Sequence, residues 1–214
     1  MEHIIIIPDE PRGIDSADCI YPPEYEGHFS RLFIKQEEII ARAADLARAI
    51  HKDYKGKRPV LLCVLKGASC FYLRLLEALQ DLRQGFYPEF LRLSSYEGTE
   101  TSGTVKVGGG LNYQDLTGKD VLIIEDMIDT GTTLSHLLPA LKKEAKVKSL
   151  EVCTLLTKRL QTPAKCEAKY VGFSIPNQFA IGYGIDYNEL YRDLKDIWVI
   201  SQQGIDFDPK VLHA

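Results

Sequence analysis

The sequence of 214 residues predicts an α/β protein with a twisted, mainly parallel sheet that is flanked by helices on both faces. Apolar runs of strand length alternate along the chain with amphipathic stretches of helical length, a pattern typical of parallel sheets. Right-handed crossovers then place the helices on the two faces. Because such sheets bind ligands beyond the carboxyl ends of their strands, the segments that follow the strands are the candidate sites.

The first half of the chain predicts two helices and two strands. Residues 37–51 carry their apolar side chains on one helical face, with Arg42 elsewhere around the helix, which indicates a surface helix. Residues 60–65 form a continuous apolar run after a Gly/Pro break and predict a strand covered on both faces. A second helix is expected at about 69–82, and another strand at 86–93.

The middle of the chain predicts a loop and then a strand, a helix and a strand. Residues 94–110 are polar and glycine-rich with little periodicity, which is typical of a long mobile loop. Residues 121–124 and 150–156 are apolar runs, and a helical pattern lies between them at about 133–145. This order repeats the strand and helix alternation of the first half.

We expect one domain over residues 1–214, with a core of about residues 37–168. Residues 1–36 and 169–214 are rich in Tyr, Pro, Gly and short apolar runs. These two segments are expected to form a small hood together. A chain of this length buries enough apolar surface to fold without disulfides or structural metals.

The composition argues against several classes of protein. With 45% hydrophobic residues, a net charge of −4 and scattered basic residues, an ordinary globular protein is expected and a nucleic-acid partner is not. The apolar run of residues 4–7 ends at Pro8, too soon for a membrane span or a signal peptide. Five cysteines without C-x-x-C spacing indicate neither a disulfide framework nor a zinc site, and favour the reducing cytoplasm.

A Gly/Thr turn between an apolar strand and a helix is the most informative segment. Backbone N–H groups and hydroxyls at a helix N-terminus make a cradle suited to a phosphate monoester. A glycine in the turn lets the backbone approach the ligand closely. The residues expected in this cradle are Thr130, Gly131, Thr132 and Thr133.

Two adjacent acids, Glu125 and Asp126, lie where the apolar strand is expected to end. Carboxylates near a core need partners such as sugar hydroxyls or a metal, and the vicinal hydroxyls of a ribose meet that need. The alternative is that Asp129 or Thr130 only caps the helix and that the acids are solvated. That alternative suits a bare D-T-G better than it suits the whole segment.

The string I-I-E-D-M-I-D-T-G-T-T at residues 123–133 resembles the phosphoribosyl pyrophosphate signature of type I phosphoribosyltransferases. Further strings, in family order, resemble the hypoxanthine-guanine phosphoribosyltransferases within that family. They are L-K-G at 65–67, S-Y at 95–96, L-T-K-R at 156–159, V-G-F at 171–173, G-Y-G-I-D-Y-N-E at 182–189 and R-D-L at 192–194. The resemblance extends from about residue 18 to residue 201.

This resemblance implies the type I phosphoribosyltransferase fold and a purine salvage reaction. With Mg²⁺ present, the 5-phosphoribosyl group of phosphoribosyl pyrophosphate would pass to N9 of hypoxanthine or guanine. The products would be IMP or GMP and pyrophosphate. A cytoplasmic homodimer or homotetramer without nucleic-acid or membrane partners is implied as well.

For the signature residues, the resemblance implies distinct roles. Asp129 would be the general base that takes the proton from N7 of the purine. Glu125 and Asp126 would hold the ribose hydroxyls and, with Asp186, would serve the magnesium ion. The 5-phosphate would lie in the turn of Thr130, Gly131, Thr132 and Thr133.

The pyrophosphate subsite and a lid are implied in the same way. Lys66 and Gly67 would contact pyrophosphate through the backbone amides of a turn that often holds a cis peptide. Arg192 would supply a cation to the same group. Ser95 and Tyr96 would begin a loop that closes over the site and keeps water from the reactive sugar.

The purine subsite would be built from residues near the C-terminal part of the chain. Lys158 would donate to O6 and so select 6-oxopurines over adenine. Phe179 would stack on the base, and the carbonyl of Ala180 would read the opposite edge. Asp186 would lie on this side too, where it would contact magnesium through water.

Each of these residues also has an ordinary explanation when it is taken alone. Residues 66–67 are then a tight turn from a strand to a helix, and Lys158 is a solvated lysine at a strand end. Phe179 would be an apolar core residue, and Asp186 and Arg192 would be surface charges.

Four positions depart from the family pattern: Ser94 replaces a basic residue, Ala180 a larger aliphatic one, and Asn177 and Gln178 charged ones. These departures are expected to affect subunit contacts, base preference and the local charge near the purine. No proposed catalytic group is missing.

Two other functions were compatible with parts of the sequence. The D-T-G-T string at 129–132 resembles the aspartic protease motif, but such proteases are all-β and need a second copy of it. A regulatory binding module on the same fold is the other alternative. The acidic charge and the presence of Asp129, Lys158 and Arg192 favour an enzyme.

Overall fold

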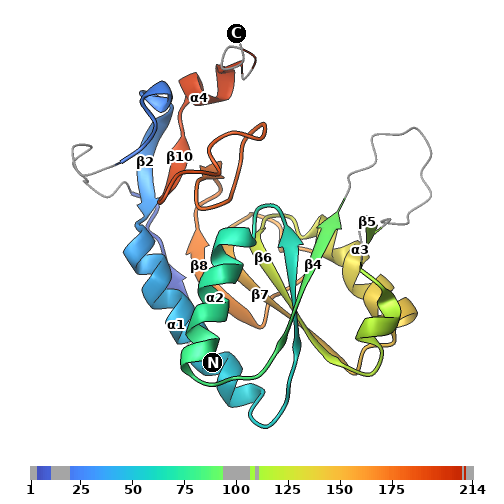
Figure 1. Ribbon diagram of the computed structural model, residues 1–214. Coiled ribbons are helices and arrows are strands. Elements are labelled where there is room, and N and C mark those ends of the chain that lie inside the picture. The colour runs from blue at the N-terminus through green and yellow to red at the C-terminus, as the bar shows by residue number, and fades with distance from the viewer. Residues whose placement is uncertain (1–3, 11–19, 94–106, 109–110, 209, 211–214) are drawn as a thin grey trace, which may run out of the picture.

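The computed structural model describes residues 4–10, 20–93, 107–108, 111–208 and 210, and a seven-stranded sheet is its largest element (Figure 1). Its strands are parallel except for β5, which runs antiparallel to β4 at one edge. The mainly parallel α/β fold predicted from the sequence is confirmed. The strands lie in the order β1 (Ile5–Ile6), β8 (Tyr170–Ile175), β7 (Ser149–Lys158), β6 (Asp120–Ile128), β3 (Val60–Leu65), β4 (Tyr87–Leu93) and β5 (Val107–Gly108).

Helices cover both faces of this sheet (Figure 1). On one face α1 (Gln36–Asp53) and α2 (Ser69–Asp81) pack against the strands. On the other face lies α3 (Thr132–Ala140), which continues into the π-helical segment η4 (Leu141–Ala145). The short 3₁₀ helix η3 (Tyr113–Leu116) leads into β6 and contacts η4.

The central strands β3 and β6 are buried on both faces because they lie in the middle of the sheet. Leu61 pairs in register with Leu122, and both side chains pack toward α1 and α2. Leu62 pairs with Ile123, and both pack toward α3. The continuous apolar runs in the sequence follow directly from this double coverage.

β6 is longer than the apolar run that predicted it. It continues past residue 124 because it stays paired with β7 as far as Ile128, which lies opposite Thr157. Glu125 and Asp126 are therefore strand residues and do not follow the strand. The helix expected at about 133–145 is also divided, since α3 gives way to η4 after Ala140.

A three-stranded antiparallel sheet forms a separate hood from two distant parts of the chain (Figure 1). Its strands are β2 (Phe29–Ile34), β10 (Ile197–Ile200) and β9 (Ala180–Ile181), in that order. The short helices η2 (Pro23–Tyr25) and α4 (Gln202–Asp206) belong to the same two parts. Its own apolar cluster contains Tyr25, Leu32, Ile181, Tyr191, Leu194, Trp198 and Ile200.

The expected boundary between core and hood differs from the strand pairing. β1 and β8 lie in the segments that the sequence assigned to the hood, yet both are strands of the large sheet. The sequence pattern did not predict β8, because Gly172 interrupts its apolar run. Glycine is needed there, since a Cβ at residue 172 would lie 2.4 Å from the carbonyl oxygen of Leu155 on β7.

The structure also bears on the membrane-spanning segments and the disulfides considered in the sequence analysis. Within the described ranges, no helix is both long enough and apolar enough to cross a membrane. Four of the cysteines, Cys63, Cys70, Cys153 and Cys166, are free thiols in the described part of the chain. Cys19 lies outside the described residues.

Arg42 is buried although the sequence placed it off the apolar face of α1. The residue is 4% exposed, and its side chain donates from Nε to the carbonyl of Gly172 at 3.0 Å and from Nη2 to that of Val171 at 2.8 Å. These carbonyls precede the residues of β8 that the two-residue strand β1 pairs with. Arg42 therefore completes the hydrogen bonding of β8 where the neighbouring strand is too short.

We expect Arg42→Met to lower the free energy of unfolding by about 2 kcal/mol or more, because it removes two charged hydrogen bonds to buried carbonyl oxygens. Arg48→Met is the matched control, since Arg48 lies on the same helix with its side chain 60% exposed. That control should change the free energy of unfolding by about 0.5 kcal/mol or less. Chemical denaturation measures both, and equal losses would contradict the role given to Arg42.

Candidate active site

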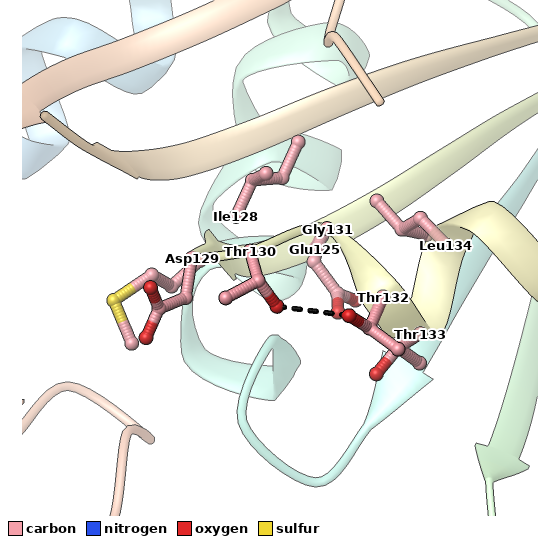
Figure 2. A pocket seen from close by; sticks show the side chains of 9 residues that line it. Glu125, Ile128, Asp129, Thr130, Gly131, Thr132, Thr133 and Leu134 are labelled. Atoms are coloured by element: carbon pink, nitrogen blue, oxygen red, sulfur yellow. Dashed lines mark hydrogen bonds between the residues drawn. The ribbon is translucent and has the colours of Figure 1, made fainter. Parts of the chain in front are cut away.

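The turn between β6 and α3 surrounds a pocket of about 90 Å³ at the carboxyl end of the sheet (Figure 2). Figure 2 shows Thr130 and Thr132 on this turn, and their hydroxyl oxygens are hydrogen-bonded at 3.0 Å. Gly131 has a φ of +71°, a left-handed conformation that favours glycine. Because the first N–H groups of a helix have no acceptor within it, the start of α3 offers donors to an anion in this pocket.

The loop between β7 and β8 supports this turn from behind. The backbone N–H of Lys165 donates to the carbonyl of Thr130 at 2.9 Å, and the Cys166 thiol contacts that of Gly131 at 3.7 Å. A Cβ at residue 131 would lie 2.8 Å from Cys166 Sγ. The sequence motifs did not predict that Lys165 and Cys166 support this turn.

Glu125 and Asp126 are carboxyl groups with little access to water. Glu125 is 8% exposed, and its Oε2 has no hydrogen-bond partner within the described residues. Burial, and then the neighbouring Asp126, raise the pKa of Glu125 well above its ordinary value. Burial also raises the pKa of Asp126, to about 6. The pair is thus a set of oxygen atoms in need of a partner.

The turn after β3 lies directly against Asp126. The Leu65–Lys66 peptide bond is cis, as the resemblance implied. A Cβ added to Gly67 would lie 1.8 Å from Asp126 Oδ2, so a side chain at position 67 would displace this carboxyl group. Lys66–Gly67 and the acid pair therefore belong to one site, although they are far apart in the sequence.

Residues 182–192 of the hood bring three charged side chains to the same turn, where they meet Lys66. Lys66 Nζ lies 2.6 Å from Glu189 Oε2, and Arg192 Nη2 lies 2.7 Å from Asp186 Oδ1 and 3.3 Å from Glu189 Oε1. Arg192 and Asp186 also contribute to the electrostatic environment of Asp126. Glu189 was not among the candidate site residues, because sequence spacing alone does not reveal its pairing with Lys66.

Lys158, Asp129 and Phe179 meet on the purine side of the site expected from the sequence. Lys158 Nζ lies 2.8 Å from Asp129 Oδ2 and 5.2 Å from the centre of the Phe179 ring. The Lys158 side chain is only 4% exposed, whereas Phe179 is 59% exposed, so much of its ring is open to solvent. Tyr187 contacts the ring of Phe179 edge-on at 6.1 Å between centroids.

The remaining candidate residues are distributed as follows. Ala180 is buried at the start of β9, so only its backbone can take part in recognition. Asp186 contacts Arg192 and accepts from the N–H of Glu189 at 2.9 Å, which places it with the cations and not with Lys158. Ser95 and Tyr96, the expected lid residues, lie outside the described residues.

Comparison with known proteins gives consistent matches. The sequence model of the phosphoribosyl transferase domain matches residues 33–188. Hypoxanthine-guanine phosphoribosyltransferase from Bos taurus is 39% identical over 206 residues, and that from Homo sapiens is 38% identical over 206 residues. In each case the match covers 94% of this chain and 94% of the relative.

Solved structures match over a similar extent. Hypoxanthine-guanine phosphoribosyltransferase from Schistosoma mansoni in complex with IMP has a TM-score of 0.79 and 28% identity, and the match covers 95% of this chain and 97% of that chain. Hypoxanthine phosphoribosyltransferase from Staphylococcus aureus has a TM-score of 0.77 and 36% identity, with 88% and 100% covered. The comparison of folds and the comparison of sequences therefore point to the same group of proteins.

We expect the raised pKa of Asp126 to make the ligand-free protein less stable as pH rises. The pKa of Asp126 is about 6 in the folded protein, whereas the ordinary value, which applies to the unfolded chain, is 3.8. Between about pH 4 and 6 the folded state therefore binds more protons than the unfolded state does. The free energy of unfolding falls as the pH rises through that window, and the decrease is complete above pH 6. Asp126→Asn should therefore be more stable than the wild type at pH 7.5, by about 1 kcal/mol or more.

At pH 4 the carboxyl group is neutral, so the variant and the wild type should have similar stability. Chemical denaturation of both proteins at the two pH values measures the difference. A stability gain of the same size at pH 4 and pH 7.5 would mean that the charge of Asp126 is not its cause.

Proposed function

The chain belongs to the hypoxanthine-guanine phosphoribosyltransferase family, and on that basis we propose that it transfers the 5-phosphoribosyl group of phosphoribosyl pyrophosphate to N9 of hypoxanthine or guanine. The products are IMP or GMP and pyrophosphate, so the enzyme acts in purine salvage. One observation carries the assignment of the site: the phosphate-sized pocket and acid pair at the end of β6 lie next to the Asp129, Lys158 and Phe179 group. A parallel α/β sheet does not fit an aspartic protease.

The phosphoribosyl group is held by the turn and the acid pair. The 5-phosphate accepts hydrogen bonds from the backbone N–H groups and hydroxyls of Thr130, Thr132 and Thr133. The ribose hydroxyls donate to Glu125 and Asp126. The unpartnered Oε2 of Glu125 supports this role, because a buried carboxyl oxygen without a donor is costly until a ligand supplies one.

Magnesium fits the oxygen-rich donor set of this site. Within the described residues, no three His, Cys, Asp or Glu side chains are grouped closely enough to bind a metal on their own. That suits Mg²⁺, which is commonly held by one or two carboxylates together with substrate phosphates. Glu125 and Asp126 would hold it with phosphoribosyl pyrophosphate, and Asp186 would contact it through water. When bound, it neutralises charge on the departing pyrophosphate.

The purine lies between Phe179 and the strand ends. Its ring stacks on Phe179, Lys158 donates to O6, and the carbonyl of Ala180 contacts the opposite edge. Because an ammonium group cannot accept from the amino group of adenine, Lys158 selects 6-oxopurines. Binding of the base moves the Lys158 ammonium from Asp129 toward O6, which leaves Asp129 to take the N7 proton.

Catalysis depends mainly on position and electrostatics. As the bond from the ribose to pyrophosphate breaks, positive charge develops on the sugar, and the nearby carboxylates stabilise it. Lys66, Gly67 and Arg192 hold the pyrophosphate as it leaves. We place the enzyme in the cytoplasm as a homodimer or homotetramer, the closed symmetric assemblies usual for such proteins.

Wild-type protein mixed with hypoxanthine, phosphoribosyl pyrophosphate and Mg²⁺ should form IMP, which ultraviolet absorbance follows. Asp129→Asn should lower kcat about 100-fold or more, because it removes the general base and keeps the size of the side chain. Asp120→Asn is the matched control, since Asp120 begins the same strand at its opposite end. It should retain normal turnover. Unimpaired turnover of Asp129→Asn would refute the assigned base.

Lys158→Met should raise the KM for hypoxanthine about tenfold or more and change that for phosphoribosyl pyrophosphate little, because a charged hydrogen bond to O6 is lost. Lys169→Met is the control. Lys169 also bridges a carboxylate and an aromatic ring, 2.9 Å from Asp53 and 5.3 Å from the ring centre of Tyr170. Steady-state kinetics with each substrate varied measures the effect, and equal changes in both KM values would show that Lys158 does not read the base.

A further inference from the structure

The two cations of the proposed pyrophosphate subsite are already paired with carboxylates of the protein itself. Glu189 bridges them, with Oε2 at 2.6 Å from Lys66 Nζ and Oε1 at 3.3 Å from Arg192 Nη2. Asp186 is the second acid, 2.7 Å from the same nitrogen of Arg192. A carboxylate bridging two cations has the charge and the spread of oxygens that a bound phosphate group would have.

The two acids differ in how firmly they are held. Asp186 uses one oxygen for Arg192 and the other for the N–H of Glu189, at 2.9 Å, so both of its oxygens serve the hood loop. Among the described residues, the Glu189 carboxylate pairs only with the two cations, and its side chain is 66% exposed. It can leave the cations by rotating into solvent without opening a cavity.

The loop that carries Glu189 is fixed to the core. Arg192 Nη1 donates to the carbonyl of Gly184 at 2.8 Å, and a Cβ at Gly184 would lie 2.4 Å from the carbonyl oxygen of Gly67. This close approach keeps Glu189 over the Lys66 turn. Lys66 first, and then Arg192, lower the pKa of Glu189, which therefore remains ionised at neutral pH.

We propose that Glu189 is an internal counter-ion that competes with pyrophosphate for Lys66 and Arg192. It holds both cations over the turn in the free enzyme, moves aside when phosphoribosyl pyrophosphate binds, and returns as pyrophosphate leaves. Arg192 Nε is buried without an acceptor in the part of the chain described, so the two acids do not satisfy the whole guanidinium group. This inference rests on the proposed function for the identity of the ligand.

The test is calorimetric titration of the full-length protein with inorganic pyrophosphate in the presence of Mg²⁺. Removing one unit charge about 4 Å from the ligand in a solvated site is worth roughly fivefold in affinity. Glu189→Gln, which keeps the shape of the side chain, should therefore bind pyrophosphate about fivefold more tightly. Its KM for phosphoribosyl pyrophosphate should fall by a similar factor, while that for hypoxanthine stays unchanged.

Glu77→Gln is the matched control, because Glu77 is also exposed, at 60%, and paired with an arginine, 2.7 Å from Arg74. It should bind pyrophosphate as the wild type does. Unchanged or weaker binding by Glu189→Gln would overturn the inference, since Glu189 would then only position Lys66. Because binding is measured without a purine, a wild type that forms no IMP would refute the proposed function separately.

Discussion

Removal of two neighbouring carboxyl groups from water, at the end of the central strand, is the constraint on which the rest of the site depends. Glu125 and Asp126 stay within β6 because the strand remains paired with β7 beyond them. Their burial raises the pKa of each and leaves Glu125 Oε2 without a partner in the described structure. Such a site is poorly satisfied when empty and well satisfied by a ligand with hydroxyl groups and a cation.

Close backbone contacts bring the parts of the site together around these acids. Gly67 allows the turn after β3 to touch Asp126, and Gly184 allows the hood loop to touch the Gly67 carbonyl. Gly131 allows the turn after β6 to rest on Cys166. Each contact excludes a Cβ. The positions of the proposed phosphate and pyrophosphate subsites relative to one another are therefore determined largely by backbone packing.

Local patterns in the sequence predicted the central elements well. The strand at 60–65 and the helix at 36–53 follow from continuous or periodic apolar residues, which depend on near neighbours. The signature segment also predicted the pocket and the acid pair. β8 was assigned to the wrong part of the fold because Gly172 breaks its apolar run, and the need for that glycine lies on another strand.

Pairings between distant segments were beyond what the sequence could show. Arg42 was placed on the surface of its helix because a lone arginine fits that face, yet the short length of β1 leaves carbonyls that it satisfies. The ion pair of Lys66 with Glu189 likewise arises only when the hood is in place. These features depend on tertiary contacts, for which hydrophobic periodicity carries no information.

The pairing of β2 with β10 has a consequence for the synthesis of the protein. Ile34 lies opposite Ile197, so this contact closes a loop of roughly 160 residues, whereas the phosphate turn and its support lie within β6 to β8. A chain emerging from the ribosome can complete its phosphate-binding half while β2 still has no partner. The proposed phosphate turn can therefore form early, whereas the proposed purine and pyrophosphate subsites are both completed by hood residues, Phe179 and Arg192, that are synthesised after it.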